Sequence, residues 1–424
     1  MAVPSAGTAI FVFIGHVERA MSETMNKHTT IMNTYARLPV TFSHGEGAWL
    51  WDEDDNKYLD ALSGIAVCGL GHAHPAVTAA ISTQAGKLVH TSNLYGIAVQ
   101  QQLADKLAAL SGMEKTFFGN SGAEANEAAI KIARLYGHNN DIAQPNIIVM
   151  EGSFHGRTMA TLSATGNRKV QAGFEPLVQG FIRVPYNDIE AIKTVAKNTD
   201  NVVAILVEPV QGEGGINIPD TDYLNGLREI CDEQNWLLML DEIQTGMGRS
   251  GKWFAFEHNN IKPDVMTLAK ALGNGVPIGV CLAAGKAADV LQPGNHGSTF
   301  GGNPLVSAAA LAVIDTMQED NLVSRAAQLG TQLIEAFAAR LANNEHVVDV
   351  RGLGLLIGIE LDTPCAELVA AALDNGLLIN VTVNNTIRLL PPLVLSDTEA
   401  TQLVDKLCTL IDSFTASQAV AAQN

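Results

Sequence analysis

The sequence predicts an α/β protein in which a large domain with a mostly parallel sheet is joined to a smaller α+β domain. Short, almost wholly apolar runs at 146–150, 202–207 and 236–240 are separated by helical stretches, as expected for strands buried on both faces of a sheet. Residues 347–390 instead group strand-like segments together. A chain of 424 residues with 47% hydrophobic residues has ample material for a large core.

The remaining elements follow in chain order. Residues 40–70 predict short strands, with Gly45 and Gly47 as turns before strands at 48–51 and 58–60. From about residue 76, long helices alternate with the apolar runs. A long helix rich in Ala and Gln is predicted near 315–345, followed by strands at 347–360 and 377–390 and a last helix from Asp397 to about Phe414.

Composition excludes several classes of function. The chain has 26 Lys and Arg against 44 Asp and Glu, a formal charge of −18, which argues against nucleic acid and anionic membrane surfaces as partners. Five scattered cysteines without a CxxC pair predict reduced thiols and a cytoplasmic location. No metal site is predicted: His72 and His74 lack a nearby acidic ligand, and Pro75 suits a helix-entry loop.

One motif, residues 118–127, combines a glycine-containing turn with the start of a helix. Ser121 and Glu124 fit a capping box, and the free N–H groups at such a helix start could cradle a phosphate. On this motif alone an ordinary helix cap is the favoured interpretation. A P-loop is excluded because its lysine is absent.

Carboxylates follow two of the buried runs. The segment 208–215 carries two acids and three glycines, and it suits either a ligand site or a tight turn with solvated acids. Asp241 and Glu242 end the next run, where burial and partner charges set a carboxyl pKa. An aspartate there could hold Mg²⁺, pair with a ring nitrogen, or cap the next helix; its position favours a functional role.

Three further segments have weaker signals. Lys270 sits among small and apolar residues, which would disfavour its ammonium form and activate a Schiff-base amine; taken alone, however, a lysine whose stem reaches water is the favoured interpretation. Phe154 beside Arg157 suits a flat anionic ligand, or a surface loop. The segment 298–304 suits oxyanion contacts, or a turn.

Together and in this order, the motifs closely resemble the class-III pyridoxal-phosphate aminotransferases of fold type I, from about residue 28 to 415. The blocks that carry the resemblance are 120–122, 154–158, 241–246, Lys270 and 298–302. It implies a smaller domain built from both ends of the chain, at 25–75 and 316–424, around a large cofactor domain at 76–315. Residues 1–24 are expected to be a disordered extension, because their apolar run is too short to span a bilayer and lacks the basic segment of a signal peptide.

The resemblance also implies roles for cofactor-binding residues. Lys270 matches the lysine that bonds to the aldehyde of pyridoxal 5′-phosphate and then moves a proton between substrate and cofactor. Asp241 matches the partner of the pyridine nitrogen, Gln244 the contact to the phenolic oxygen, and Phe154 the residue stacked on the ring. The further implied contacts are Ser121, Gly122, Ala123, Glu242, Ile243 and, from the partner subunit of a homodimer with shared active sites, Thr299.

Substrate residues are implied in the same way. Arg388 matches the arginine that holds the α-carboxylate in the 2-oxoglutarate half-reaction, and Glu213 the acid that pairs with it when an ω-amino group reacts. Arg157 matches a second carboxylate anchor, and Ser298 a contact across the dimer. The implied activity is ping-pong transfer of the ω-amino group of acetylornithine to 2-oxoglutarate, in arginine biosynthesis. Succinylornithine, succinyl-diaminopimelate, ornithine and 4-aminobutyrate remain alternative donors.

Two departures from the family pattern are visible. Asn274 stands where relatives often have glycine, just past Lys270, so loop geometry could differ. The segment 62–67 lacks the tyrosine expected in true ornithine aminotransferases, which lowers the case for unacylated ornithine. A non-catalytic regulator with a DNA-binding arm is disfavoured, because the chain has no basic helix-turn-helix module and keeps both Lys270 and Asp241.

Overall fold

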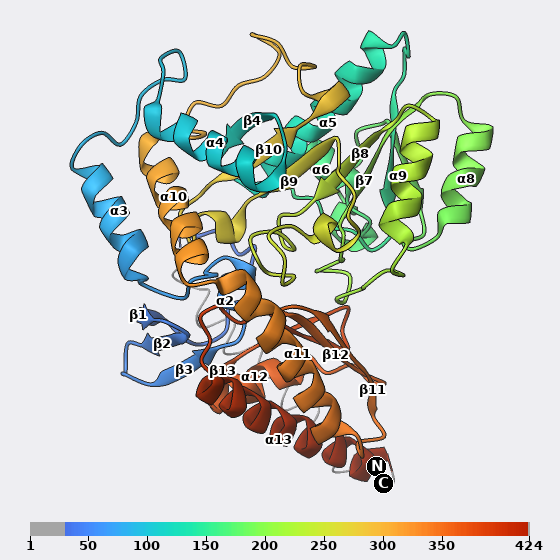
Figure 1. Ribbon diagram of the computed structural model, residues 1–424. Helices are drawn as coiled ribbons and strands as arrows, with labels where there is room; N and C mark the ends of the chain where they lie inside the picture. The colour runs from blue at the N-terminus through green and yellow to red at the C-terminus, as the bar shows by residue number, and fades with distance from the viewer. Residues whose placement is uncertain (1–29, 423–424) are drawn as a thin grey trace. The chain divides into compact units, whose positions relative to one another are not determined.

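A seven-stranded, mostly parallel sheet forms the centre of the computed structural model (Figure 1). Its strand order is β4 (Lys115–Gly119), β10 (Gly279–Ala283), β9 (Val265–Leu268), β8 (Leu237–Asp241), β7 (Val202–Val207), β5 (Asn146–Met150) and β6 (Phe181–Val184). The strands from β9 to β6 run parallel, and β10 is antiparallel to both of its neighbours. Strands β7 to β10 are buried throughout. The prediction that the apolar runs are strands buried on both faces of a sheet is therefore confirmed, although the run predicted at 236–240 forms β8 one residue later, at Leu237–Asp241.

The structure describes residues 30–422, and the chain divides after Thr41 into two compact units. Residues 30–41 contain no helix or strand, and the predicted extension at 1–24 lies outside the described residues. All regular elements of the described chain belong to the second unit. Among the described residues, no helix is long and apolar enough to cross a membrane.

Helices cover the central sheet. Helix α5 (Gly122–Asn139) packs against β4, β7, β9 and β10 through the apolar face predicted from Ala128, Ala129, Ile132 and Ala133. Helix α9 (Tyr223–Glu233) packs on β7 and β8, and α8 (Ile189–Asn198) lies beside it (Figure 1). The other elements of this region are α3 (Pro75–Ala85), α4 (Ala98–Ser111), α6 (Met159–Ala164), α7 (Arg168–Gln171), α10 (Pro304–Glu319), η1 (Ala255–His258), η2 (Lys270–Leu272) and η3 (Gly285–Ala287).

Two four-stranded sheets make up the smaller part. One contains β1 (Phe42–Glu46), β2 (Trp49–Asp52), β3 (Lys57–Asp60) and β13 (Leu377–Leu378); the other contains β11 (Val347–Leu353), β12 (Leu356–Leu361), β15 (Thr386–Leu389) and β14 (Asn380–Thr382). Strand β13 pairs with β3, so the two ends of the chain share a sheet, as the predicted architecture requires. The helices here are α11 (Leu322–Leu341), α12 (Glu367–Asp374) and α13 (Asp397–Ala422), whereas the element α2 (Ser63–Ala66) is a short turn with positive φ angles at all four residues. The domain boundaries at 75 and 315 stay a prediction.

Several predicted elements are wrong in detail. The single helix at 315–345 is two helices, because Asn321 adopts a left-handed conformation (φ 53°) that ends one helix and begins the next. The predicted strand at 347–360 is a hairpin that turns at Gly354 (φ 59°), and 377–390 holds three short strands. Gly45 lies within β1, not in a turn; a Cβ there would approach His72 Cβ to 2.7 Å.

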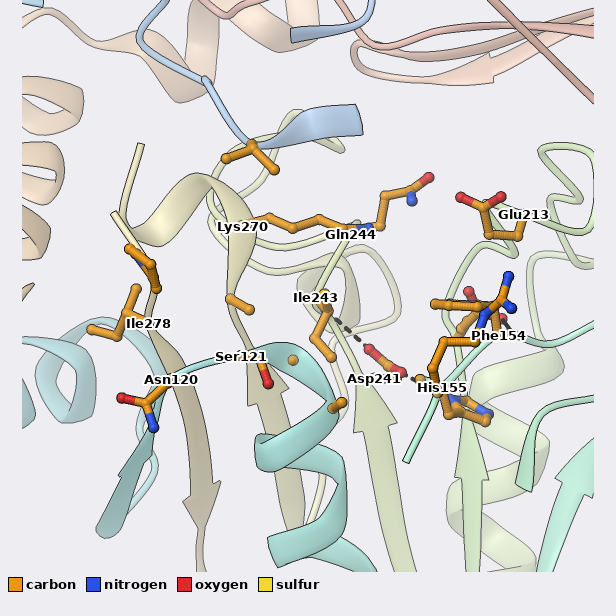
Figure 2. Close-up of a pocket in the computed structure, with 18 of the residues that line it drawn as sticks. Asn120, Ser121, Phe154, His155, Glu213, Asp241, Ile243, Gln244, Lys270 and Ile278 are labelled. Atoms are coloured by element: carbon orange, nitrogen blue, oxygen red, sulfur yellow. Dashed lines mark hydrogen bonds and ion pairs between the residues drawn. The ribbon is translucent and has the colours of Figure 1, made fainter. Parts of the chain in front are cut away.

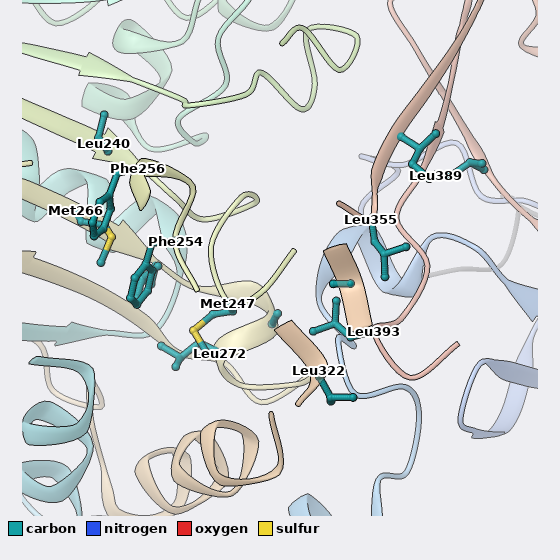
Figure 3. Packing of buried hydrophobic residues seen from close by; sticks show 14 of the residues in the cluster. Leu240, Met247, Phe254, Phe256, Met266, Leu272, Leu322, Leu355, Leu389 and Leu393 are labelled. Carbon is teal, nitrogen blue, oxygen red and sulfur yellow. The ribbon is translucent and has the colours of Figure 1, made fainter. Parts of the chain in front are cut away.

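A buried apolar cluster runs from the central sheet to the smaller sheets. Figure 3 shows Leu240 and Met266 from the central strands near Phe254 and Phe256, whose rings stack at 5.7 Å. Leu272, two residues after Lys270, is fully buried in this cluster. The core therefore anchors the turn that carries Lys270.

The loop 71–75 is the helix entry that the sequence predicts. His74 is the N-cap residue of α3 and Pro75 its first residue, while His72 Nε2 lies 2.8 Å from Asp60 Oδ2. In residues 30–422 no group of three or more His, Cys, Asp or Glu side chains could hold a metal ion. Although burial disfavours the imidazolium, hydrogen bonds to Asp60 and Cys68 raise the pKa of His72 to about 9.

This pair predicts a pH-dependent contribution to stability. Since the pKa of His72 is raised from 6.5 to about 9 on folding, the contribution is fully present below pH 6.5 and is lost as the pH rises through about 9. We expect a loss of at most about 3 kcal/mol across this range. Thermal unfolding of the parent and of His72→Gln at pH 6 and pH 9 tests this: only the parent should lose stability beyond the common baseline. Equal losses in both proteins would contradict an ionic His72–Asp60 pair.

Candidate active site

A cavity of about 410 Å³ opens where the carboxyl ends of β7 and β8 meet the start of α5 and the turn that carries Lys270 (Figure 2). This is the edge of an open α/β sheet at which ligands bind. Ten residues predicted from the sequence line it: Ser121, Gly122, Ala123, Phe154, Arg157, Glu213, Asp241, Ile243, Gln244 and Lys270. The folded chain thus brings together motifs that lie up to 150 residues apart.

The start of α5 forms one wall. Ser121 is the N-cap residue, and its Oγ accepts a hydrogen bond from the Glu124 N–H at 3.2 Å. Ser121 is therefore the predicted N-cap, but Glu124 Oε2 accepts the Asn120 N–H at 2.6 Å, one residue before the N–H that a capping box would use. A Cβ on Gly122 would lie 2.7 Å from Ile243 Cδ1, so a larger residue here would require the Ile243 side chain to shift. The first turn of the helix presents free N–H groups and the positive end of its dipole to the cavity.

Three N–H donors fix the carboxylate of Asp241. Its Oδ2 accepts hydrogen bonds from Asn126 Nδ2 and from His155 Nδ1, both at 2.8 Å, and its Oδ1 accepts the Ile243 N–H at 3.1 Å (Figure 2). Thr267 Oγ1 in turn donates to Asn126 Oδ1 at 2.8 Å. With 4% of its surface exposed, Asp241 presents a carboxylate of fixed orientation. Sequence reasoning missed Asn126, although a polar side chain on the apolar face of a predicted helix is a signal that could have found it.

Lys270 extends its side chain into the cavity toward Gln244 (Figure 2). Its backbone is left-handed (φ 46°), a strained conformation for a residue other than glycine. Desolvation lowers the pKa of its amine, and the charge of Glu213 only partly opposes this effect. Gln244 Oε1 is buried without a hydrogen-bond partner. The absence of a side chain on Gly212 leaves room for this oxygen, since a Cβ on residue 212 would lie 2.0 Å from Gln244 Oε1.

Two side chains on the opposite wall suit a planar anionic ligand. The Arg157 guanidinium lies 5.7 Å from the centre of the Phe154 ring, and both line the cavity. The Phe154 N–H donates to Glu208 Oε2 at 3.0 Å. Burial raises the pKa of Glu208 to about 7, with His155 opposing and Asp241 adding to the shift. Glu208 therefore holds the backbone of the aromatic residue, a role that the sequence did not reveal.

An ion pair closes the far end of the cavity. Arg388 Nη1 lies 2.5 Å from Glu213 Oε1, and Arg388 Nε donates to Asn380 Oδ1 at 2.9 Å. Arg388 is fully buried on β15, whereas Glu213 lines the cavity. The pair predicted from the sequence is therefore formed in this structure.

Four predicted contact residues lie outside the cavity lining: Arg388, which is fully buried and contacts the lining residue Glu213, and Glu242, Ser298 and Thr299. The Glu242 carboxylate accepts the Ala255 and Phe256 N–H groups at 2.7 and 2.9 Å, so it is directed into the protein, and burial raises its pKa to about 7. Ser298 and Thr299 line a separate surface hollow of the same chain. The roles predicted for these residues stay predictions.

The comparisons with known proteins agree with this geometry. The family model for class-III aminotransferases matches residues 30–411. The chain belongs to the class-III aminotransferases. It is 60% identical to an acetylornithine aminotransferase of Nitrosomonas europaea over 92% of this chain and 99% of that protein.

Solved structures give the same family and fold. This aminotransferase superposes on an acetylornithine aminotransferase from Elizabethkingia anophelis with a TM-score of 0.82 and 36% identity, covering 93% of this chain and 99% of the other. An ornithine aminotransferase from Toxoplasma gondii, solved with partial occupancy of PLP at its active site, gives a TM-score of 0.87 and 34% identity, covering 92% and 96%. The predicted fold type and the predicted transaminase class are confirmed.

Proposed function

We propose that this aminotransferase transfers the ω-amino group of acetylornithine to 2-oxoglutarate, with pyridoxal 5′-phosphate as cofactor, in arginine biosynthesis. The observation that carries the proposal is the Arg388–Glu213 ion pair at the end of a cavity that also holds Lys270 and Arg157. The relative that is 60% identical to this chain is named an acetylornithine aminotransferase, which supports acetylornithine as the amino donor.

The residues present fit pyridoxal 5′-phosphate. The start of α5 suits its phosphate, Asp241 its ring nitrogen, and the unpartnered Gln244 Oε1 marks a polar contact that the protein alone does not satisfy. When bound, the cofactor supplies an electron sink for negative charge that develops on the substrate carbon. Asp241 would keep the proton on the ring nitrogen, and Phe154 would offer its aromatic ring as a stacking surface.

Lys270 acts as both nucleophile and proton carrier. Because desolvation lowers the pKa of its amine, more of the neutral, nucleophilic form is present at neutral pH than for an exposed lysine. With the cofactor bound, the same amine would take a proton from the reacting carbon of the substrate and deliver it to the cofactor.

The ion pair explains how one cavity accepts two substrates. With Glu213 on Arg388, the arginine is neutralised, so an ω-amino donor binds through its distant carboxylate on Arg157. When Glu213 moves away, Arg388 is free to bind the α-carboxylate of 2-oxoglutarate in the second half-reaction. A charge-assisted bidentate contact of this kind contributes about 1.5–3 kcal/mol.

A homodimer with shared sites is part of the proposal. Large apolar side chains are exposed on two loops, including Leu94 (88%), Tyr95 (69%) and Phe300 (59%), and Asn93 Nδ2 ties these loops together by donating to the Ser298 carbonyl at 3.0 Å. Exposed apolar groups of this size are typical of subunit interfaces. Ser298 and Thr299 lie on the same loop as Phe300, so in a dimer they would contact the ligands in the partner's cavity.

A donor panel tests the substrate assignment. We expect acetylornithine to have the highest kcat/KM, with 4-aminobutyrate about 10- to 100-fold lower, because its carboxylate lies one carbon nearer to the reacting amine and it has no acylamino group. Succinylornithine, succinyl-diaminopimelate and ornithine complete the panel, each with 2-oxoglutarate as acceptor. A higher kcat/KM for 4-aminobutyrate than for acetylornithine would make the assignment wrong.

A further inference from the structure

Asn274 lies between two stretches of the cavity wall but directs its side chain away from the cavity. Ala269 and Lys270 line the cavity before it, and residues 275–278 line it afterwards. The Asn274 side chain instead bonds to the backbone of a distant loop: its Oδ1 accepts the Leu70 N–H at 2.8 Å, and its Nδ2 donates to the Gly71 carbonyl at 3.0 Å. One side chain thus joins two segments 200 residues apart.

The turn that Asn274 belongs to has an unusual backbone. Both Lys270 (φ 46°) and Asn274 (φ 45°) are left-handed, and the Gly273 N–H donates to the Lys270 carbonyl at 3.0 Å. Glycine would adopt the conformation at 274 with less strain, and asparagine tolerates it better than other residues do. The backbone conformation alone therefore does not require asparagine at this position. The two hydrogen bonds need a side chain with both an acceptor and a donor, which the asparagine amide supplies.

The loop at the other end of this contact is itself held in place. Val67 from this loop lines the cavity, and the Leu393 N–H donates to the Gly69 carbonyl at 2.7 Å. His72, the next residue after Gly71, pairs with Asp60. A fixed loop on one side and the Lys270 turn on the other make the Asn274 amide a bridge between two cavity walls.

We propose that Asn274 is a positioning residue, which holds the Lys270 turn against the loop 67–71 and so fixes where the Lys270 amine stands relative to the reacting carbon. The proposal rests on the proposed role of Lys270. Two hydrogen bonds across the turn restrict its rotation, and proton transfer is sensitive to displacements of the donor nitrogen of about 1 Å.

Asn274→Gly removes both hydrogen bonds and leaves a residue that is comfortable in the left-handed conformation. In the holoenzyme we expect kcat to fall about tenfold, with KM for 2-oxoglutarate unchanged within about twofold. We also expect a shift in the pH midpoint of the visible absorbance of the bound cofactor, since that absorbance depends on the placement of the Lys270 nitrogen. Asn260→Gly is the matched control: Asn260 is also left-handed (φ 52°) but exposed, so the same relief of strain should leave kcat and the midpoint unchanged.

A second variant keeps the test decisive if the first does not fold. Asn274→Asp retains the acceptor for the Leu70 N–H but loses the donor to the Gly71 carbonyl, so kcat should lie below that of the parent. Parent-like kcat and midpoint in the variants that fold, with or without a lower melting temperature, would overturn the proposal. Borohydride reduction of the parent holoenzyme, followed by peptide mapping, separates this outcome from failure of the proposed role of Lys270, because Lys270 stays unlabelled only if it does not bond to the cofactor.

Discussion

Replacing Lys270 by alanine is expected to lower kcat for transamination by at least about 10³-fold and to abolish the visible absorbance of the bound cofactor. The effect is large because one nitrogen carries two roles, that of the nucleophile toward the cofactor aldehyde and that of the general base toward the substrate carbon. No other lysine lines the cavity in the described chain, so no neighbouring amine can take over.

Two controls make this prediction specific. Lys262→Ala removes an exposed lysine away from the cavity and should retain the parent kcat and absorbance. A small primary amine such as methylamine, added to Lys270→Ala, should restore part of the activity, because it supplies a free base in the space that the side chain leaves. Parent-like kcat in Lys270→Ala without added amine would show that this residue does not carry the chemistry.

The central sheet could be predicted from the sequence because burial on both faces leaves a strong local pattern. The runs at 146–150 and 202–207 are strands with those bounds, since almost every position in them must be apolar. The break at Asn321 could not be predicted in the same way. Both flanking helices are rich in strong helix formers such as Ala, Leu and Gln, and one left-handed residue divides them.

Segment 62–67 shows how tertiary contacts override local preference. Ser63, Ile65 and Ala66 all have positive φ angles, of 43°, 65° and 60°, which their side chains disfavour. Asp60 Oδ1 accepts the Leu62 and Ser63 N–H groups, and Ser63 Oγ donates to the Leu390 carbonyl at 2.5 Å. Asp60 is a local signal for a turn, but the Leu390 carbonyl lies 327 residues away in the sequence, so the residue types alone do not reveal the positive φ angles.

The site was predictable where its chemistry depends on residue type at a strand end or helix start. Asp241 and Ser121 are of this kind, because position within the fold explains their roles. The sequence did not reveal the roles of residues that act through other residues. His155 and Asn126 donate hydrogen bonds to Asp241, and Glu208 accepts the Phe154 N–H. Glu242, next to Asp241 in the sequence, directs its carboxylate to the Ala255 and Phe256 N–H groups within the protein, which its residue type and position alone did not reveal.

Asp241→Asn is expected to lower kcat by about 10³-fold while the fold is retained. A neutral amide cannot keep the proton on the ring nitrogen, so the cofactor would stabilise negative charge on the substrate carbon much less. The substitution also leaves one amide N–H₂ facing a donor, because Asn126, His155 and Ile243 all donate to the carboxylate in the parent. Cofactor affinity should therefore also fall, which equilibrium dialysis would measure.

Asp264→Asn is the matched control for this variant. Asp264 Oδ2 accepts the Leu238 N–H and Arg228 Nη1, both at 2.8 Å, near the opposite ends of the strands β8 and β9. Because its carboxylate is structural and remote from the cavity, Asp264→Asn should lower the melting temperature but keep kcat within about twofold of the parent. If both variants lost activity and melting temperature in parallel, the loss at Asp241 would reflect folding. If Asp241→Asn kept kcat within about threefold, the proposed pairing with the ring nitrogen would be wrong, because a protonated ring is what makes the cofactor an electron sink.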